Sequence, residues 1–424
     1  MKEDFLHYVW KFQKFTSSHF TTVAGETVQV VSPGLHNFNA GPDFLNAQLV
    51  IDGQLWAGNV ELHLKSSDWY AHQHHDDEGY DSVLLHVVWE YNVAVFRAND
   101  TVIPTLELKQ IVKPAAKQAY LNLIDKQATF IKCEQEFPSI DTFIVDNWLE
   151  RMYLERLQQK TETIYAGLDK GFSHWEALLF QQLSKNFGLK VNGDSFLSIA
   201  NSVPFSVVQK CKDNVLTLEA LLFGQAGLLQ KKVEDDYIKN LQNEYAFLQK
   251  KFKLTNQTVV TPKFFRLRPP NFPTIRLSQL AVLYSKEQHL FSRLIEATTK
   301  EKLYAIFEVK ASSYWNSHFN FGTTSPQKEK RLTKNFIDLL LINTVIPIKF
   351  CYAKYLGRDN SEALLDLAAS ISAEKNTVVS YFNTLKPIAK NAMHTQALLH
   401  LKRHYCDNHR CLQCAIGIEI LSKN

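Results

Sequence analysis

Residues 59–65 read NVELHLK and alternate between apolar and polar side chains. Successive side chains of an extended strand point to opposite faces, so this pattern predicts a strand with one apolar face. The other face carries Glu61, His63 and Lys65. An acid, an imidazole and an amine in a row indicate either a solvated strand face or one wall of a functional site.

The strand belongs to a longer segment, FLNAQLVIDGQLWAGNVELHLK (residues 44–65), which predicts a hairpin that turns at Asp52-Gly53. With that turn, facing residues have numbers that sum to about 105. Glu61 is then expected opposite Phe44, with Asp43 within reach. Carboxylate oxygens are the ligands that Mg²⁺ or Mn²⁺ prefers, so Asp43 and Glu61 predict a divalent-metal site.

The flanking sequence predicts a small α/β domain over residues 1–112. A helical apolar stripe at residues 2–15 precedes the hairpin, and a polar turn follows it. Three further strands are expected, at residues 26–34, 83–91 and 101–109. The fold class is therefore α/β (α+β), with a larger, mostly α-helical C-terminal region over residues 113–424.

Charge is unevenly distributed along the 424 residues. Residues 1–110 hold 6 Lys/Arg, 14 Asp/Glu and 8 of the 15 His, whereas the remainder holds 41 Lys/Arg and 29 Asp/Glu. An acidic, His-rich segment joined to a basic one suits a metal site beside an anion-binding surface, although ordinary variation between domains would look the same. No membrane span and no signal peptide are expected, which predicts a cytoplasmic protein. No feature predicts an oligomeric state.

The sequence Pro42-Asp43, followed after a hairpin by Glu61 on a strand, resembles the PD-(D/E)xK nuclease superfamily. The resemblance implies a restriction-endonuclease-like core that cleaves DNA or RNA with Mg²⁺ or Mn²⁺ held by the two acids. The superfamily's lysine would stand where this chain has His63, and Lys65 comes two residues later. The resemblance therefore implies that His63 replaces the lysine, that Lys65 reaches back, or that activity has been lost.

A longer string, NAGPDF followed by WAGNVELHLKSSDWYAHQHHDDEGYDSVLLHVVWEY, resembles an uncharacterised bacterial family known only as a domain of unknown function (DUF2851-like). The resemblance extends over most of the chain, including RLRPPNFPTIRLSQLA and the terminal YCDNHRCLQCAIG. It brings no activity with it.

The histidines around the hairpin offer a second kind of site. A zinc ion is an alternative occupant of this region, and its candidate ligands are His63, His72, His74 and His86. No H-E-x-x-H spacing supports this alternative. A single histidine in an apolar strand, such as His86, is usually a hydrogen-bonded core residue.

The C-terminal tail holds Cys406, Cys411 and Cys414 in the spacing C-x4-C-x2-C. Together with His404, His409 or a distant cysteine, these thiols would suit Zn²⁺ or an iron–sulfur cluster. The alternative is three plain thiols on a terminal helix. The other cysteines, at 133, 211 and 351, are expected to be isolated buried thiols.

A proline-rich segment, TPKFFRLRPPNFPTIRL (residues 261–277), is expected to be extended. Its basic residues stand among aromatic ones and are candidates for binding nucleic acid: Lys263, Arg266, Arg268 and Arg276. The alternative is a segment that wraps the helical core with its aromatic side chains buried.

Three functions follow from these patterns. The first is a metal-dependent, nuclease-like enzyme that acts on nucleic acid. The second is a non-catalytic module that binds nucleic acid or protein on a nuclease-like scaffold. The third is a different metal hydrolase that uses the histidine cluster.

Overall fold

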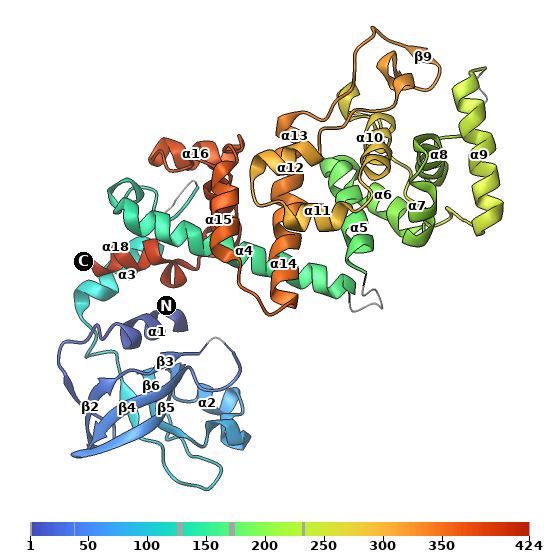
Figure 1. The fold of residues 1–424 in the computed structure, drawn as a ribbon. Coiled ribbons are helices and arrows are strands. Elements are labelled where there is room, and N and C mark those ends of the chain that lie inside the picture. Colours follow the sequence, from blue (N-terminus) through green and yellow to red (C-terminus); the bar gives the residue numbers. More distant parts are fainter. Residues whose placement is uncertain (1, 38, 125–129, 169–173, 231–233, 424) are drawn as a thin grey trace. The chain divides into compact units, whose positions relative to one another are not determined.

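The structure is a computed structural model that describes residues 2–423 except 38, 125–129, 169–173 and 231–233. Its contacts divide the chain into two compact units. The first comprises Met1–Trp148 together with Leu401–Asn424, and the second is Leu149–His400. The structure is thus a mixed α/β unit with a sheet and a larger helical part, as the sequence predicts (Figure 1).

A seven-stranded sheet forms the first unit, in the order β1-β2-β4-β5-β6-β7, with β3 paired to β4. Its strands are β1 (His19–Thr21), β2 (Thr27–Ser32), β3 (Leu35–His36), β4 (Phe44–Ile51), β5 (Gln54–Lys65), β6 (Val83–Glu90) and β7 (Thr105–Glu107). The strands up to β5 pair antiparallel, whereas β5, β6 and β7 are parallel neighbours. The sheet is therefore mixed, with its change of direction at β5.

The predicted hairpin between β4 and β5 is confirmed, since Ile51 pairs with Gln54. Asp52 and Gly53 have φ values of +48° and +81°. Two successive left-handed residues are what a type I′ turn requires, and Asp-Gly is among the pairs that adopt it at low cost. The turn residues thus set the register at this end of the hairpin.

A β-bulge changes that register before the strands reach the acidic residues. Ala47 pairs with Gly58, as the turn predicts, but Phe44 pairs with Val60 rather than with Glu61. Asn46, with φ +57°, stands within the irregular stretch. The bulge adds one residue to β4, and every side chain of β4 before it therefore points to the opposite face of the sheet from the one that the turn predicts. As a result Asp43 is the cross-strand neighbour of Glu61, and both side chains lie on the same face. The approximate pairing of Glu61 with Phe44 is thus shifted by one residue, and Asp43 is within reach of Glu61 as expected.

Different elements cover the two faces of the sheet. The predicted N-terminal helix is confirmed as α1 (Glu3–Lys11), which packs against β5 and buries Phe5 and Val9 with Val60 and Leu62 (Figure 1). The connection from β5 to β6 contains α2 (Asp68–Ala71) and two short 3₁₀ turns, η1 (His74–Asp76) and η2 (Glu78–Tyr80). This connection has its own small core around buried Trp69.

The C-terminal tail returns to the first unit. It forms η7 (Lys402–Cys406), η8 (Cys411–Gln413) and α18 (Ala415–Ser422), and α18 contacts α3 (Pro114–Ile124). Leu412 and Leu421 join the same core as α1. The sequence suggested a boundary after residue 112 and placed the cysteine-rich tail in the helical domain. The structure places both the tail and residues 113–148 in the first unit, because apolar contacts distant in sequence decide the division.

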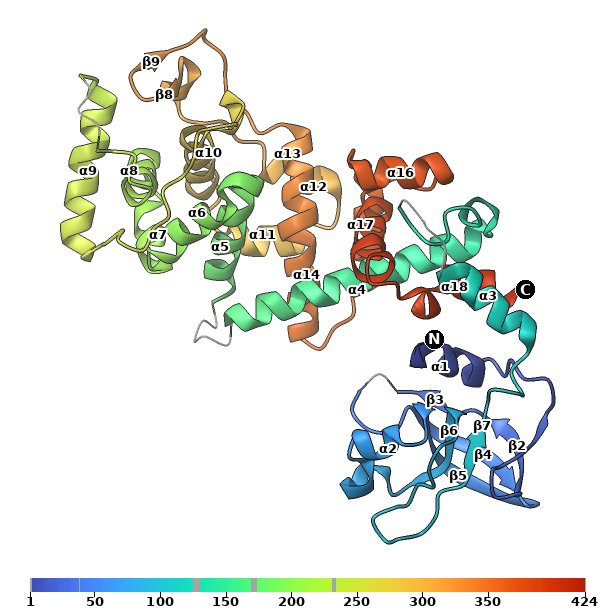
Figure 2. The ribbon, with the colours of Figure 1, turned by 180° about the vertical axis from the view of Figure 1, so that it is seen from behind.

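The second unit is helical, as Figure 2 shows from behind. The long helix α4 (Thr142–Leu168) begins in the first unit and continues into the second. The other helices are α5 (Trp175–Phe187), α6 (Leu189–Asn201), α7 (Phe205–Cys211), α8 (Val215–Gln225), α9 (Asp236–Phe252), α10 (Pro273–Lys286), α11 (Leu290–Glu296), α12 (Lys300–Ile306), α13 (Lys334–Leu340), α14 (Ile346–Tyr355), α15 (Ser361–Ser370), α16 (Thr377–Leu385) and α17 (Ala392–Leu401). A small hairpin, β8 (His318–Asn320) and β9 (Thr323–Thr324), lies among them.

One helical run among the described residues, Lys334–Tyr355, is long and apolar enough by length and composition to cross a membrane. In the structure, 72% of its apolar stretch is buried inside the protein. The run also carries Lys349, whose ammonium group is buried against backbone carbonyls of α11. These features are typical of a helix in the core of a globular unit.

Candidate metal centre on the mixed sheet

Asp43 and Glu61 meet where β4 begins beside β5. The backbone N–H of Asp43 donates to Glu61 Oε2 at 3.0 Å, and the N–H of Leu62 donates to Asp43 Oδ2 at 3.0 Å. From α1, His7 places its Nε2 3.2 Å from Asp43 Oδ2. Each acid is therefore held by a backbone N–H of the other strand, and Glu61 Oε1 takes no part in these two hydrogen bonds.

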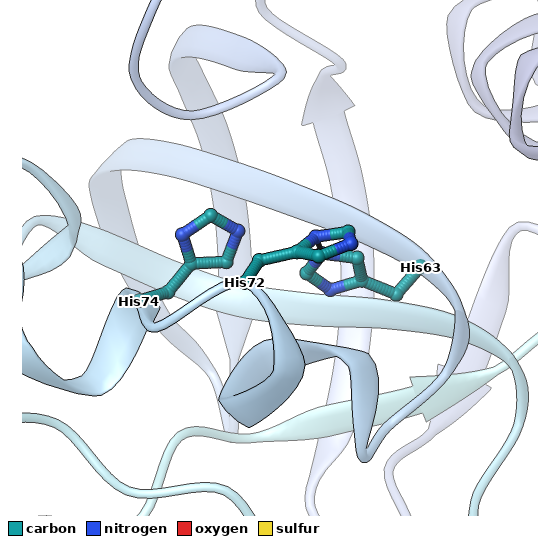
Figure 3. Close-up of side chains that lie close together, drawn as sticks. All are labelled: His63, His72 and His74. Atoms are coloured by element: carbon teal, nitrogen blue, oxygen red, sulfur yellow. Dashed lines mark hydrogen bonds between the residues drawn. The ribbon is translucent and has the colours of Figure 1, made fainter.

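Glu61 Oε1 faces a group of histidines. It lies 3.3 Å from His74 Nε2 and 3.6 Å from His63 Nε2. His63 Nε2 is also 3.0 Å from His72 Nδ1, and its other nitrogen, Nδ1, is 2.8 Å from His86 Nε2. Figure 3 shows the rings of His63, His72 and His74 close together. A single carboxylate thus joins an acidic half of the site to an imidazole half.

The connection after β5 determines where His72 and His74 lie. His72 follows the last residue of α2, and Gln73 adopts a left-handed conformation with φ +61°, so that the chain turns between the two histidines. The ring of His74 stacks on Tyr80 at a centroid distance of 3.8 Å. Packing on Tyr80 and on buried Trp69 orders a short segment that has little regular structure of its own.

The three imidazoles form a set with the geometry of a metal site. One donor nitrogen from each of His63, His72 and His74 lies within 4.8 Å of the other two. His74 Nε2 is buried, and its 3.3 Å contact with Glu61 Oε1 lacks hydrogen-bond geometry, so it makes no hydrogen bond among the described residues. Imidazole nitrogens with one carboxylate oxygen suit Zn²⁺, Fe²⁺, Co²⁺ or Mn²⁺, whereas Mg²⁺ prefers a shell of oxygen ligands. The donor set therefore suits a transition-metal ion better than Mg²⁺, whereas the site predicted from Asp43 and Glu61 alone had only oxygen ligands.

His86 supports His63 from the neighbouring strand β6. A neutral imidazole donates from one nitrogen and accepts at the other, so the contact with His86 constrains the tautomer of His63. When His63 Nδ1–H donates to His86, the Nε2 lone pair of His63 is free toward His72 and Glu61. Metal-ligating histidines commonly have such a partner on the second nitrogen.

The electrostatics of the site separate the two acids. Burial raises the pKa of Glu61 to about 8, and the charge of Asp43 adds to this effect. Burial acts against ionisation of Asp43 as well, but His7, the N–H of Leu62 and His63 together outweigh it and lower the pKa of Asp43. Burial, and then the neighbouring histidines, lower the pKa of His63 to about 2. His63 is thus a neutral imidazole, which is the form that binds metal, and it lacks the positive charge of a lysine.

We expect the metal-free protein to lose stability as the pH rises through the titration of Glu61. Glu61 has a pKa of about 8 in the folded protein and 4.5 as its ordinary value, which we take for the unfolded chain. The contribution of this group to stability is therefore complete below about pH 4.5, where it is protonated in both states. That contribution is lost between about pH 5 and pH 8, by at most about 1.4 kcal/mol per pH unit. Urea unfolding in EDTA should show this slope in wild type and not in Glu61→Gln. Wild type and Glu61→Gln share the other titratable groups that face this position, which are Asp43, His7, His63 and His74. Only Glu61 differs between them, so equal dependence of their unfolding free energies on pH would contradict the prediction.

Lys65 does not join this site. It shares a strand face with Glu61 and His63 by alternation, but its side chain is exposed and its backbone N–H is bonded to Asp68 Oδ2 at 2.9 Å. The zinc alternative predicted from sequence named His63, His72, His74 and His86, which the structure does bring together. His7 was missed, because nothing in the local sequence of α1 shows that it reaches Asp43.

The proline-rich segment is only partly available for nucleic acid. Lys263, Arg266 and Arg268 are exposed, and Phe265 is 77% exposed with the guanidinium of Arg266 5.2 Å from its ring. Arg276 is different, since it lies in α10 and is only 5% exposed.

The guanidinium of Arg276 is used inside the protein. It donates to Gln279 Oε1 at 2.8 Å and to Asn271 Oδ1 at 2.6 Å, and it lies over the ring of Phe336. The prediction that Arg276 is available to bind nucleic acid was therefore wrong. Its helix α10 begins at Pro273, a favourable first position, so the extended segment ends earlier than expected.

These features define a mixed α/β protein with a buried carboxylate–imidazole site on its sheet. A family model described as "Protein of unknown function (DUF2851)" matches residues 3–377, and the chain belongs to this family. The cysteine-rich tail, which the sequence resemblance included, lies beyond the matched residues. Searches of curated proteins and of solved structures returned no match.

Proposed function

We propose that this chain is a metal-dependent phosphodiesterase that acts on nucleic acid. Glu61, His63, His72 and His74 would hold a divalent transition-metal ion, with Asp43 beside it. The observation that carries the proposal is the position of Glu61. One of its carboxylate oxygens accepts the backbone N–H of Asp43, and the other faces the imidazoles of His63 and His74. Such an ion supplies a bound water of lowered pKa for attack on a phosphodiester.

The order of elements supports a nuclease-like core. A helix, α1, is followed by the antiparallel strands β2, β4 and β5, and a crossover through α2 leads to the parallel strand β6. The first acid precedes the second of these strands and the second acid lies on the third. This order agrees with the PD-(D/E)xK resemblance of the sequence and supports the proposal. The β-bulge in β4 brings both acids to one face.

The exposed basic segment supports a nucleic-acid substrate. Lys263, Arg266 and Arg268 can contact phosphates, and the exposed ring of Phe265 can stack on a base. The first 110 residues are acidic, so charge attraction to phosphates must come from the rest of the chain.

One observation favours a module that binds nucleic acid without cleaving it. The position of the superfamily's lysine is occupied by the neutral His63, and Lys65 is exposed. Without an ammonium group at that position, the chain has one fewer charge to stabilise the developing phosphate charge. Binding of labelled DNA or RNA without cleavage, in the presence of the bound metal, would identify this second function.

The metal site can be tested with Mn²⁺, which cysteine thiolates bind poorly. EDTA-stripped protein should bind one Mn²⁺ ion per chain, more tightly than Mg²⁺, as measured by electron paramagnetic resonance of free Mn²⁺. Replacing both His72 and His74 by Ala should weaken binding by about 100-fold or more, since two ligands are lost. His19→Ala, an exposed histidine on β1, is the matched control. Equal Mn²⁺ affinity in the double variant and wild type would refute the site.

A further inference from the structure

The C-terminal tail brings its three cysteines to a fourth one, Cys133. The sequence suggested that Cys133 was an isolated thiol, but Cys133 and Cys411 pack against the same apolar core, and η8, which begins at Cys411, contacts η7, which ends at Cys406. The charges of Cys411 and Cys414 act on Cys133, and that of Cys133 acts on Cys406. Cys406 also interacts with Cys411 and Cys414, and these two interact with each other. All six pairs among the four sulfurs are therefore close enough to interact electrostatically, and all four residues belong to the first unit.

The surroundings of the four sulfurs are those of a ligand set rather than of chance neighbours. Cys414 is buried, and the backbone N–H groups of Ile416 and Gly417, at the start of α18, lie close enough to its sulfur to favour the thiolate. N–H donors directed at a sulfur stabilise its thiolate form and are common around metal-bound cysteines.

The backbone around Cys411 is closely packed. A side chain at Gly417 would place its Cβ 2.1 Å from the carbonyl oxygen of Cys411, so only glycine fits there. The N–H of Cys414 donates to the same carbonyl at 3.2 Å. This close approach holds Cys411 and Cys414 at the two ends of η8, next to the start of α18.

We infer that Cys133, Cys406, Cys411 and Cys414 hold a four-iron, four-sulfide cluster. The wide spacing of the sulfurs favours this cluster over a zinc ion. A zinc ion with bonds of about 2.3 Å holds its four sulfurs within about 4 Å of one another. Among the described residues, the histidines have three donor atoms within 4.8 Å of one another, and no three of these thiols do. The sulfurs are therefore farther apart than a single zinc ion would hold them. In a cubane each cysteine binds a different iron, so the sulfurs lie farther apart.

The cluster would act as a clamp between distant parts of the sequence. It joins the segment after α3 to the C-terminal tail, and η8 of that tail contacts α1. The helix α1 in turn carries His7, which lies against Asp43. The clamp thus supports the element that completes the acidic half of the metal centre, although the inference does not depend on the proposed function.

The test is the analysis of the full chain purified without air. We expect about four iron and four acid-labile sulfide per chain, with the broad visible absorption of an iron–sulfur cluster. Cys133→Ser should lose nearly all of the sulfide and the absorption. Cys211→Ser, a buried thiol in the second unit, should keep both. Sulfide distinguishes the cluster from iron bound at the histidines.

A second measurement covers the case in which Cys133→Ser does not fold. In wild type, iodoacetamide should leave all four cysteines unmodified until the cluster is destroyed by oxidation and chelation, after which all four react together. Zinc or no metal in the anaerobic protein, a cluster that survives Cys133→Ser, or alkylation of Cys133 independently of the other three would each overturn the inference.

Discussion

Glu61→Gln is expected to reduce metal-dependent cleavage of nucleic acid by about 10³-fold or more while the fold stays intact. The substitution removes the carboxyl group that faces His63 and His74, and with it the carboxylate ligand of the proposed ion. A glutamine oxygen can still accept the N–H of Asp43. Because burial raises the pKa of Glu61 to about 8, the metal-free wild type carries a neutral side chain at pH 7, which glutamine resembles. Function and stability should therefore separate in this variant.

The measurement is single-turnover cleavage of single-stranded, duplex and flapped DNA and of RNA, with Mn²⁺, Co²⁺, Zn²⁺ or Mg²⁺. Glu90→Gln, an acid on β6 that is half exposed and paired with Lys109, is the matched control and should cleave like wild type. Cleavage that persists unchanged in Glu61→Gln would assign the activity to another site or to a contaminant. Wild type that binds Mn²⁺ but cleaves none of the substrates would favour the binding module.

Lys349→Met is expected to lower the free energy of unfolding of the helical unit by about 3 kcal/mol. The ammonium of Lys349 donates to the carbonyls of Leu294, Ile295 and Ala297 at 2.8, 2.6 and 3.0 Å. Leu294 and Ile295 lie in the last turn of α11 and Ala297 follows it, so no further helical N–H is available to these carbonyls. Methionine fills a similar volume but leaves three buried acceptors without a donor, and each such loss costs about 1 kcal/mol or more.

Burial lowers the pKa of Lys349 to about 8, so part of this cost is offset by relief of a buried charge. Lys354→Met on the same helix, α14, is the control, because Lys354 is exposed. Urea unfolding followed by tryptophan fluorescence should show a lower midpoint for Lys349→Met only. Equal midpoints in the two variants would mean that water replaces the lysine at the end of α11.

Elements that depend on nearby residues can be predicted from the sequence alone. The stripe of Phe5 and Val9 predicts α1, and Asp52-Gly53 predicts the hairpin, because helix periodicity and turn conformation are local properties. The alternation in residues 59–65 correctly places Glu61 and His63 on one face of β5. The residue types alone also named the histidines that come together, although as an alternative rather than as the main site.

Other features depend on contacts between residues distant in sequence. The bulge at Asn46 has no local signal that fixes its place, yet it decides whether Asp43 and Glu61 share a face, because one extra residue reverses the alternation of a strand. Whether a basic side chain such as Arg276 faces solvent or Phe336 depends on how helices pack. Cys133 joins the tail cysteines because α18 returns to the core of the first unit, a result of burying Leu412 and Leu421. Local patterns therefore predict the strands and the donor groups, whereas burial of distant apolar residues selects which donors meet.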